Sequence, residues 1–214
     1  MGASRYIAVE GPIGVGKTAL ARVLANRLSA RFLEETSDNP FLGRFYQDRA
    51  RNALQTQLFF LLARYQQQQS DLSQGDLFAP TVLADYLFQK DGIYAGLTLS
   101  PDELTLYQKV FGLLAPRVPR PDLVIYLSAR PEVLLGRVRK RNQQQEKFVT
   151  LEYVEEVAQS YSRFFFHWAE SPLLVVDTSE VDLAGDPRQL EDLLAIIRRH
   201  RGGVQHYIPT PGSR

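Results

Sequence analysis

Eight consecutive residues near the N-terminus have the types and spacing needed to hold phosphate groups. They are Gly11, Pro12, Ile13, Gly14, Val15, Gly16, Lys17 and Thr18. They match the phosphate-binding loop (P-loop) pattern G-x-x-x-x-G-K-[ST], in which backbone N–H groups surround phosphate oxygens. In this pattern the lysine reaches the outer phosphates and the threonine hydroxyl binds magnesium. The stretch therefore predicts a nucleotide site, with Lys17 on the phosphates and Thr18 as a ligand of Mg²⁺.

Two adjacent carboxylates, Glu34 and Glu35, follow a short apolar segment at residues 31–33. If that segment is a strand of a parallel sheet, its carboxyl end lies beside the P-loop. A carboxylate there can take the proton from an attacking hydroxyl or help to hold magnesium. An ordinary acidic start of a loop explains the two residues at least as well.

Tyr46, Gln57 and Arg64 are spaced 11 and 7 residues apart, so they share one face if the segment is a single helix. A phenol, an amide and a guanidinium are unusual on a helix that is otherwise rich in Leu and Phe. Gln offers a donor and an acceptor side by side, which suits the edge of a nucleobase. A solvated face with a chance alignment explains the spacing equally well.

A basic cluster at residues 137–141 is followed by Glu146. Arg137 and Arg141 are four residues apart and share a helix face. Phosphoryl transfer needs cations that neutralise the charge of the departing phosphoryl group, so the cluster fits a mobile lid over the phosphates. A basic helix end that complements the helix macrodipole is the alternative.

Strand-like and helix-like segments alternate along the chain, which predicts an α/β fold with a five-stranded parallel sheet flanked by helices. Strands are expected at residues 6–9, 31–33, 78–84 (beginning after Pro80), 123–127 and 173–176. Helices are expected at residues 18–28, 45–72, 101–115, 131–140 and 150–168, and from residue 186 onwards. Residues 1–201 are expected to form a single P-loop domain and residues 202–214 a loose tail. Ligands bind such sheets beyond the carboxyl ends of the strands, next to the P-loop, Glu34, Glu35 and Asp85.

The composition narrows the class of protein. The 214 residues carry a net charge of +1 and include no cysteine. The charge gives no argument for nucleic-acid binding, and the lack of cysteine excludes disulfides and thiolate chemistry. No apolar run reaches the length of a membrane-spanning helix, and residues 1–5 lead directly into the first strand without room for a signal peptide. We therefore expect a cytoplasmic protein without a membrane or nucleic-acid partner.

Seven segments, taken in order, cover nearly the whole chain and match one enzyme family. They are residues 10–18, 39–46, 57–64, 85–88, 121–127, 137–146 and 151–153. On these segments the chain resembles the bacterial deoxynucleoside kinases, the group of deoxyadenosine, deoxyguanosine and deoxycytidine kinases. The P-loop alone is shared by many families, whereas the Gln57-to-Arg64 spacing together with the lid is much more specific.

The resemblance implies that the γ-phosphoryl group of ATP, or of another nucleoside triphosphate, is transferred to the 5′-hydroxyl of a deoxynucleoside, with purine deoxynucleosides favoured. It also implies Mg²⁺ and a homodimer formed through the helices at residues 45–72 and 100–115. One alternative is a nucleoside monophosphate kinase or another small-molecule P-loop kinase. The other is a nucleotide-binding regulatory protein without catalysis.

The resemblance also implies roles in acceptor binding. Tyr46 and Glu146 match the residues that hold the 3′-hydroxyl of the deoxyribose, and Gln57 matches the one that pairs with the base edge. Arg64 and Asp85 match residues that line the base pocket.

For catalysis, Lys17, Arg137 and Arg141 match the cations on the donor phosphates, and Glu34 or Glu35 matches the carboxylate that deprotonates the 5′-hydroxyl. Counting from Lys17 favours Glu35, and counting back from Asn39 favours Glu34. We predict Glu34, because it keeps the usual strand ending.

The chain departs from the family pattern in two places. The family has an acidic residue, Arg and Ser six to four positions before its pocket aspartate. If that aspartate is Asp85, Ala79-Pro80-Thr81 stands in their place. A third lid arginine is replaced by Gln143. The first departure removes a magnesium-site carboxylate and a cation near the 5′-hydroxyl, and it is the reason for considering a protein without catalysis.

Overall fold

The computed structural model describes residues 5–35, 38–73 and 81–210, and a parallel sheet lies at its centre. The six strands are arranged in the order β2-β3-β1-β4-β5-β6, and all neighbours run parallel. They are β1 (Arg5–Glu10), β2 (Arg31–Leu33), β3 (Thr81–Ala84), β4 (Leu123–Ser128), β5 (Leu173–Asp177) and β6 (Val204–Tyr207). The inner strands β1 and β4 are almost entirely buried, which is why they consist largely of apolar residues.

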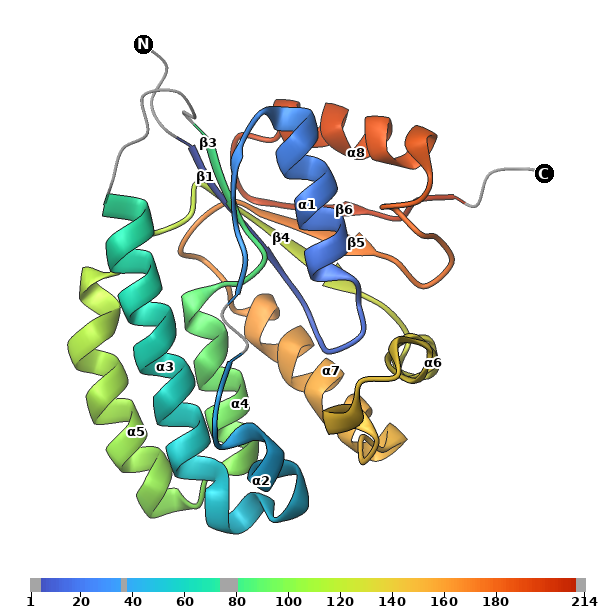
Figure 1. The fold of residues 1–214 in the computed structure, drawn as a ribbon. Coiled ribbons are helices and arrows are strands. Elements are labelled where there is room, and N and C mark those ends of the chain that lie inside the picture. Colours follow the sequence, from blue (N-terminus) through green and yellow to red (C-terminus); the bar gives the residue numbers. More distant parts are fainter. Residues whose placement is uncertain (1–4, 36–37, 74–80, 211–214) are drawn as a thin grey trace.

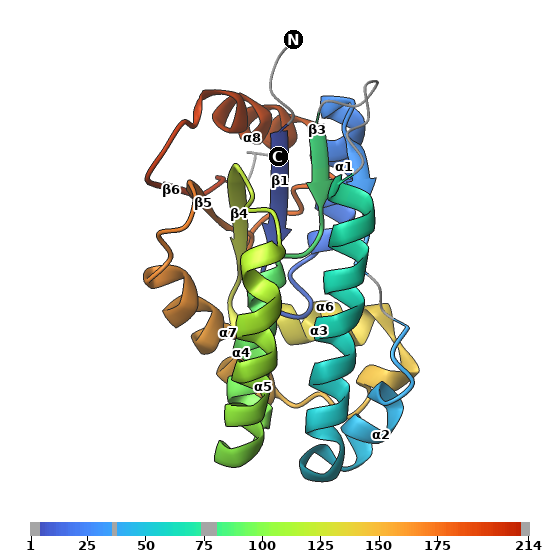
Figure 2. The same ribbon diagram turned by 90° about the vertical axis from the view of Figure 1, so that its left-hand side faces the viewer.

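Helices cover both faces of the sheet, so the predicted α/β fold is confirmed. They are α1 (Lys17–Leu28), α2 (Leu42–Gln47), α3 (Arg49–Ser73), α4 (Asp91–Thr98), α5 (Pro101–Leu114), α6 (Pro131–Arg141), α7 (Leu151–Phe166) and α8 (Pro187–Arg199). Short 3₁₀ turns are η1 (Phe88–Lys90), η2 (Ala115–Arg117) and η3 (Gln144–Glu146). Helices α1 and α8 lie on one face of the sheet, and α4 and α7 lie on the other (Figure 1). Helices α3, α4 and α5 stand side by side and extend beyond the carboxyl ends of the strands (Figure 2).

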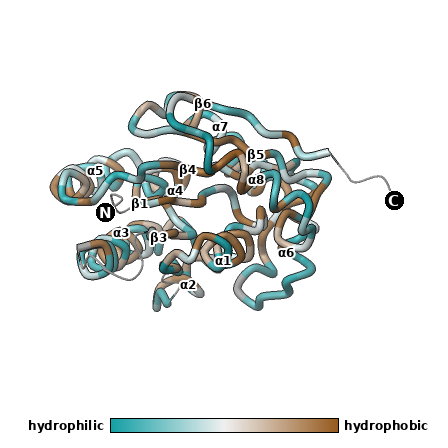
Figure 3. Tube along the Cα trace, turned by 90° about the horizontal axis from the view of Figure 1, so that it is seen from above, coloured by the Kyte–Doolittle hydropathy of each residue, from teal (hydrophilic) through white to brown (hydrophobic). Residues whose placement is uncertain are grey.

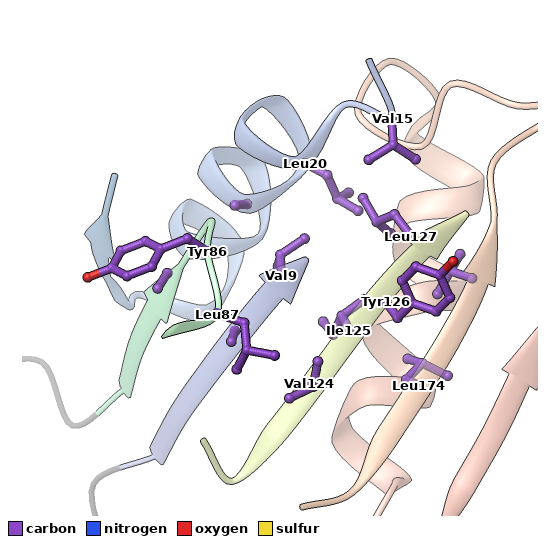
Figure 4. Packing of buried hydrophobic residues seen from close by; sticks show 14 of the residues in the cluster. Val9, Val15, Leu20, Tyr86, Leu87, Val124, Ile125, Tyr126, Leu127 and Leu174 are labelled. Carbon is purple, nitrogen blue, oxygen red and sulfur yellow. The ribbon is translucent and has the colours of Figure 1, made fainter. Parts of the chain in front are cut away.

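The main hydrophobic core lies between the sheet and helices α1, α4, α6, α7 and α8, and a smaller cluster joins α3 to α5. Hydrophobic stretches gather towards the middle of the molecule, around β4 and β5 (Figure 3). Figure 4 shows Leu20 of α1 and Val15 of the P-loop beside Leu127 of β4, and all three are buried. The apolar residues of α1 therefore fix the helix that carries Lys17 and Thr18 against the sheet.

The sheet has six strands, not the five predicted. The additional strand is β6, which lies in the segment expected to be a loose tail. Its residues pair with β5 from Leu173 opposite Val204 to Val176 opposite Tyr207, and the Tyr207 hydroxyl donates to Gln189 Oε1 of α8 at 3.1 Å. This edge strand is largely exposed and lacks an apolar run, so the hydrophobic pattern gave no sign of it.

The long helix expected at residues 45–72 is divided into α2 and α3. The break lies at Asp48, whose extended backbone (φ −144°, ψ 92°) ends α2. The helix expected from Ser100 is confirmed as α5, with the Ser100 N–H donating to Glu103 Oε2 at 2.9 Å. Within the described ranges, no helix is both long enough and apolar enough to cross a membrane.

Candidate active site

The P-loop connects β1 to α1 and has the backbone that its glycines allow. Gly14 and Gly16 have φ angles of 80° and 98°, which side chains disfavour. A Cβ atom on Gly14 would also lie 2.5 Å from the carbonyl oxygen of Leu134. The free N–H groups at the start of α1, with no acidic residue in the first turn, make this end of the helix suited to an anion.

Lys17 is folded back onto this loop. Its Nζ donates to the carbonyl oxygens of Gly11 at 2.7 Å and Pro12 at 3.4 Å. Burial lowers the pKa of Lys17, and the Glu10 carboxylate, 4.0 Å away, acts in the opposite direction. The lysine is therefore held at the loop, where phosphate oxygens would bind.

Thr18 and Asp85 form a pair of oxygen groups beside the P-loop. The Thr18 hydroxyl donates to Asp85 Oδ2 at 2.5 Å, and the backbone N–H of Glu35 donates to Asp85 Oδ1 at 2.6 Å. Burial raises the pKa of Asp85. No group of three or more His, Cys, Asp or Glu side chains in the described part of the chain could hold a metal by itself. The pair nevertheless suits Mg²⁺, which is usually bound by one or two carboxylates together with substrate phosphates and water.

Glu34 and Glu35 lie in very different surroundings. The Glu34 side chain is 54% exposed and pairs with Arg22 on the outside of α1, with Nη2–Oε distances of 3.0 and 3.1 Å. Glu35 turns inward: its Oε1 accepts from Arg64 Nε at 2.8 Å and its Oε2 accepts from Lys90 Nζ at 2.7 Å. Burial alone would raise the pKa of Glu35, but Arg64, Lys90 and Lys17 outweigh it and lower the pKa to about 2.

Arg64 is shared between two carboxylates. It also pairs with Asp91 at the start of α4, and both side chains are almost fully buried. Asp91 Oδ2 is buried and has no hydrogen-bond partner within the described residues. The arginine thus links Glu35 to a carboxylate oxygen that is free to accept a hydrogen bond.

Asp85 lines the cavity as predicted for a pocket residue, but Arg64 pairs with Asp91 and not with Asp85. Asp85 was expected beside Arg64, but its carboxylate bonds to Thr18 and to the Glu35 backbone instead. If Asp91 were the aspartate of the family pattern, Asp85, Tyr86 and Leu87 would stand six to four positions before it, and the acidic position would be filled. Of the three residues that stand six to four positions before Asp85, Ala79 and Pro80 lie outside the described residues and Thr81 begins β3.

One cavity of about 750 Å³ is lined by Lys17, Thr18, Glu35, Arg64, Asp85 and Lys90, whereas Asp91 is not among its lining residues. Gln57 and Arg64 of α3 both line it, as their spacing predicted. Gln57 is buried and donates from Nε2 to the Thr98 hydroxyl at 3.2 Å. Tyr46 belongs to α2, so the continuous helix assumed for its alignment is interrupted, and its side chain lies outside the described part of the chain. Of the residues predicted for the site, eleven line this cavity: Ile13, Gly14, Lys17, Thr18, Glu34, Glu35, Gln57, Arg64, Asp85, Arg141 and Glu146.

The two arginines of the predicted lid are placed differently. Arg141 pairs with Glu146 at the rim of the cavity, with Nε 3.2 Å from Oε2. Arg137 donates to the Thr178 hydroxyl at 3.0 Å and the Thr178 carbonyl at 2.6 Å, and its Nη1 lies 3.4 Å from the carbonyl oxygen of Val15 in the P-loop. Burial lowers its pKa. Arg137 thus connects α6 to the P-loop and to the segment after β5.

Two buried charged residues of the site were missed in the sequence. Lys90 and Asp91 are 3% and 1% exposed, at the junction of η1 and α4. In the sequence they look like the polar start of an ordinary surface helix, since Asp is common in a first turn. The one available signal was their place within the apolar stretch from Tyr86 to Ala95, where charges are unusual unless they are paired.

Comparisons with known proteins show which proteins the chain is similar to. A family model described as deoxynucleoside kinase matches residues 7–200. Deoxyguanosine kinase of Bacillus subtilis (strain 168) is 32% identical over 203 residues, which cover 92% of this chain and 98% of that protein. Deoxyadenosine kinase of Dictyostelium discoideum is 35% identical over 193 residues, covering 88% of this chain and 77% of that protein.

A solved structure has the same fold. The deoxyadenosine kinase from M. mycoides, with the products dCMP and a flexible dCDP bound, superimposes with a TM-score of 0.79 at 22% sequence identity. The match covers 90% of this chain and 98% of that chain.

Proposed function

The chain belongs to the deoxynucleoside kinase family, and on that premise we propose that it transfers the γ-phosphoryl group of ATP, or of another nucleoside triphosphate, to the 5′-hydroxyl of a deoxynucleoside. One observation carries the proposal: Glu35 lies between the P-loop side of the cavity and Arg64. A hydroxyl bound against Glu35 is close to the phosphates, while the rest of the acceptor extends towards Arg64 and Gln57.

In the proposed reaction the 5′-oxygen attacks the γ-phosphorus as the bond to the β-phosphate oxygen breaks, and the 5′-hydroxyl proton passes to Glu35. Such transfers are accelerated mainly by positioning and by charge neutralisation. The backbone N–H groups of Ile13, Gly14 and Gly16, together with Lys17, Arg137 and Arg141, are the proposed partners of the donor phosphates; Pro12 has no N–H, and those of Gly11 and Val15 donate within the protein. Thr18 and Asp85 are the residues that would hold Mg²⁺, which would supply positive charge to offset the charge of the phosphates.

We propose Glu35 as the general base, in place of the Glu34 predicted from the strand ending. The Glu34 carboxylate is engaged by Arg22 on the exposed side of α1, whereas the Glu35 carboxylate faces the cavity. A pKa near 2 makes Glu35 a weak base. This weakness is compatible with a loose transition state, because the hydroxyl proton then becomes acidic only as the new bond forms.

The acceptor base is proposed to bind against Gln57 and Arg64. Gln57 offers a donor and an acceptor and Arg64 offers donors, whereas the buried Asp91 pairs with Arg64 and does not line the cavity. This mixed set, together with relatives named deoxyguanosine and deoxyadenosine kinases, supports purine deoxynucleosides as the favoured substrates. Glu146 at the rim and Tyr46 in α2 remain the proposed partners of the 3′-hydroxyl.

The test is ADP release measured by a coupled assay with each of the four deoxynucleosides, and with dAMP as a phosphorylated control. We expect turnover with a purine deoxynucleoside and much less with dAMP, which a nucleoside monophosphate kinase would prefer. Glu35→Gln and Glu34→Gln form a matched pair, and we expect only the first to lower kcat strongly, to a residual rate that can still be measured. Absence of turnover with all four deoxynucleosides, in protein that still binds ATP, contradicts the proposal.

We also propose a cytoplasmic homodimer. Leu62 of α3 and Leu106 and Leu113 of α5 are large apolar side chains that are 45%, 49% and 71% exposed on neighbouring helices. A second copy covering this surface would remove it from water. Light scattering during gel filtration should give the mass of two chains, and Leu113→Glu should shift it towards one.

A further inference from the structure

Lys90 is a buried cation that has no role in the P-loop pattern or in the proposed base pocket. It ends η1, is 3% exposed and lies next to Asp91 in the chain. Lysine is rarely buried to this degree unless a carboxylate compensates its charge. Its partners therefore indicate its role.

Two carboxylates approach the Lys90 ammonium group. Glu35 Oε2 is 2.7 Å from Nζ and Glu10 Oε2 is 3.8 Å from it. Glu35 belongs to the segment after β2 and Glu10 to the end of β1. The lysine thus connects the proposed base to the residue that directly precedes the P-loop.

Glu10 is the fixed member of this group. It is fully buried, and its carboxylate accepts from the Gly11 N–H at 2.8 Å, the Leu87 N–H at 2.8 Å and the Tyr161 hydroxyl at 3.1 Å. A carboxylate bound by three donors from different segments has little freedom to turn. It can therefore hold a neighbouring cation in a constant position.

The two carboxylate oxygens of Glu35 accept different numbers of hydrogen bonds. Oε1 accepts from both Nε and Nη2 of Arg64, whereas among the described residues only Lys90 donates to Oε2. Each carboxylate oxygen has about two acceptor sites, so Oε1 is filled and Oε2 keeps one. Within the described surroundings, the free acceptor site of the base is on the oxygen that Lys90 holds.

We propose that Lys90 is a positioning residue that, anchored by Glu10, fixes Glu35 so that Oε2 takes the proton of the acceptor hydroxyl. This rests on the proposed function, in which Glu35 is the base. Lys90 takes no proton and touches no reacting atom in this proposal. Its effect on the reaction passes through Glu35.

The experiment is a double-mutant cycle on the full-length protein, with Lys90→Met, Glu35→Gln and the combination. We expect Lys90→Met to lower kcat by roughly 10²-fold, as misplacement of a catalytic group does. The ATP dissociation constant should change less than about twofold, because the phosphate loop is untouched. In the Glu35→Gln background the same change should lower kcat by less than about threefold, since residues that act as a unit are not additive.

Three further variants complete the test. Lys90→Arg should recover most of the lost kcat, because it restores the charge beside Oε2. Lys90→Gln, a second neutral variant, should repeat the effect of Lys90→Met. Arg198→Met removes an exposed positive charge from α8 and should leave kcat unchanged.

Equal losses from Lys90→Met with and without Glu35→Gln would overturn the proposal, as would an unchanged kcat. Loss of ATP binding and folding in both neutral variants would overturn it too, since the lysine would then serve the fold. Glu35→Gln with full activity would instead remove the premise that Glu35 is the base. The double-mutant cycle thus tests the role of Lys90, whereas the single Glu35→Gln variant tests whether Glu35 is the base.

Discussion

The phosphate side and the acceptor side of the cavity are built in opposite ways. The phosphate side comes from one contiguous segment, residues 11–18, and depends largely on backbone geometry, such as the positive φ angles of Gly14 and Gly16. The acceptor side comes from side chains on separate segments, in which Arg64 and Lys90 converge on Glu35. A site made of backbone follows from a local pattern, whereas a site made of convergent side chains depends on the whole topology.

The largest expected effect comes from replacing Lys17 on the phosphate side of the cavity. It tests whether the two sides bind their ligands independently. Lys17→Ala should lower kcat by about 10³-fold or more, the range seen when a cation on the moving phosphoryl group is lost. Deoxynucleoside binding, measured by the rise in melting temperature on adding the nucleoside, should persist because the acceptor side is intact. Loss of both would show that the two sides do not bind independently.

A smaller effect is expected at the acceptor end. Asp91→Asn leaves Arg64 with one carboxylate and should lower kcat/KM for the preferred deoxynucleoside by roughly 10²-fold, the cost of truncating one partner of a buried charge pair. The ATP dissociation constant should stay the same. Asp102→Asn, at an exposed position in the first turn of α5, is the control and should leave kcat/KM unchanged.

Asp85 lies where the phosphate side and the acceptor side of the cavity meet. We expect its replacement to change mainly the Mg²⁺ requirement of the reaction. Asp85→Asn should raise the Mg²⁺ concentration for half-maximal activity by roughly tenfold or more, the range for removing a group that supports a bound metal. Saturating Mg²⁺ should restore much of the rate. A change in the deoxynucleoside KM with no change in the Mg²⁺ requirement would return Asp85 to the base pocket.

The smallest effect concerns stability. The pKa of Glu35 is lowered from 4.5 to about 2, so its ion pairs stabilise the fold above pH 4.5 and are lost as the pH falls towards 2. The stability advantage of the wild type over Glu35→Gln, of the order of 3 kcal/mol, should decrease as the pH falls from 4.5 towards 2. Urea unfolding without nucleotide and with EDTA measures it, and Glu34→Gln, at an exposed pair, should show little such dependence.

The sequence predicted the parts of the fold and site that local patterns encode. The P-loop, the capped start of α5 and the apolar inner strands were recognised because each depends on neighbours in the chain. Gln57 and Arg64 were recognised because both stand on α3, where spacing determines the face.

The features that local patterns did not predict involve contacts between distant segments. Asp85 and Asp91 are both aspartates of one short stretch, and only the packing of α3 against α4 shows which of them meets Arg64. The inward turn of Glu35 rather than Glu34 depends on Arg64 and Lys90, which come from two other segments. Strand β6 was missed because an exposed edge strand carries no hydrophobic periodicity.

The pairing of β1 has a consequence for the order of folding. In the sheet, Ile7 lies opposite Leu83 on one side and Leu123 on the other, so β1 completes its ladders only when two remote segments have arrived. Closing loops of this length is entropically costly and slow. The P-loop, the easiest feature to recognise in the sequence, therefore gains its support late. During refolding, recovery of ATP binding should mark completion of the central sheet rather than an early local event.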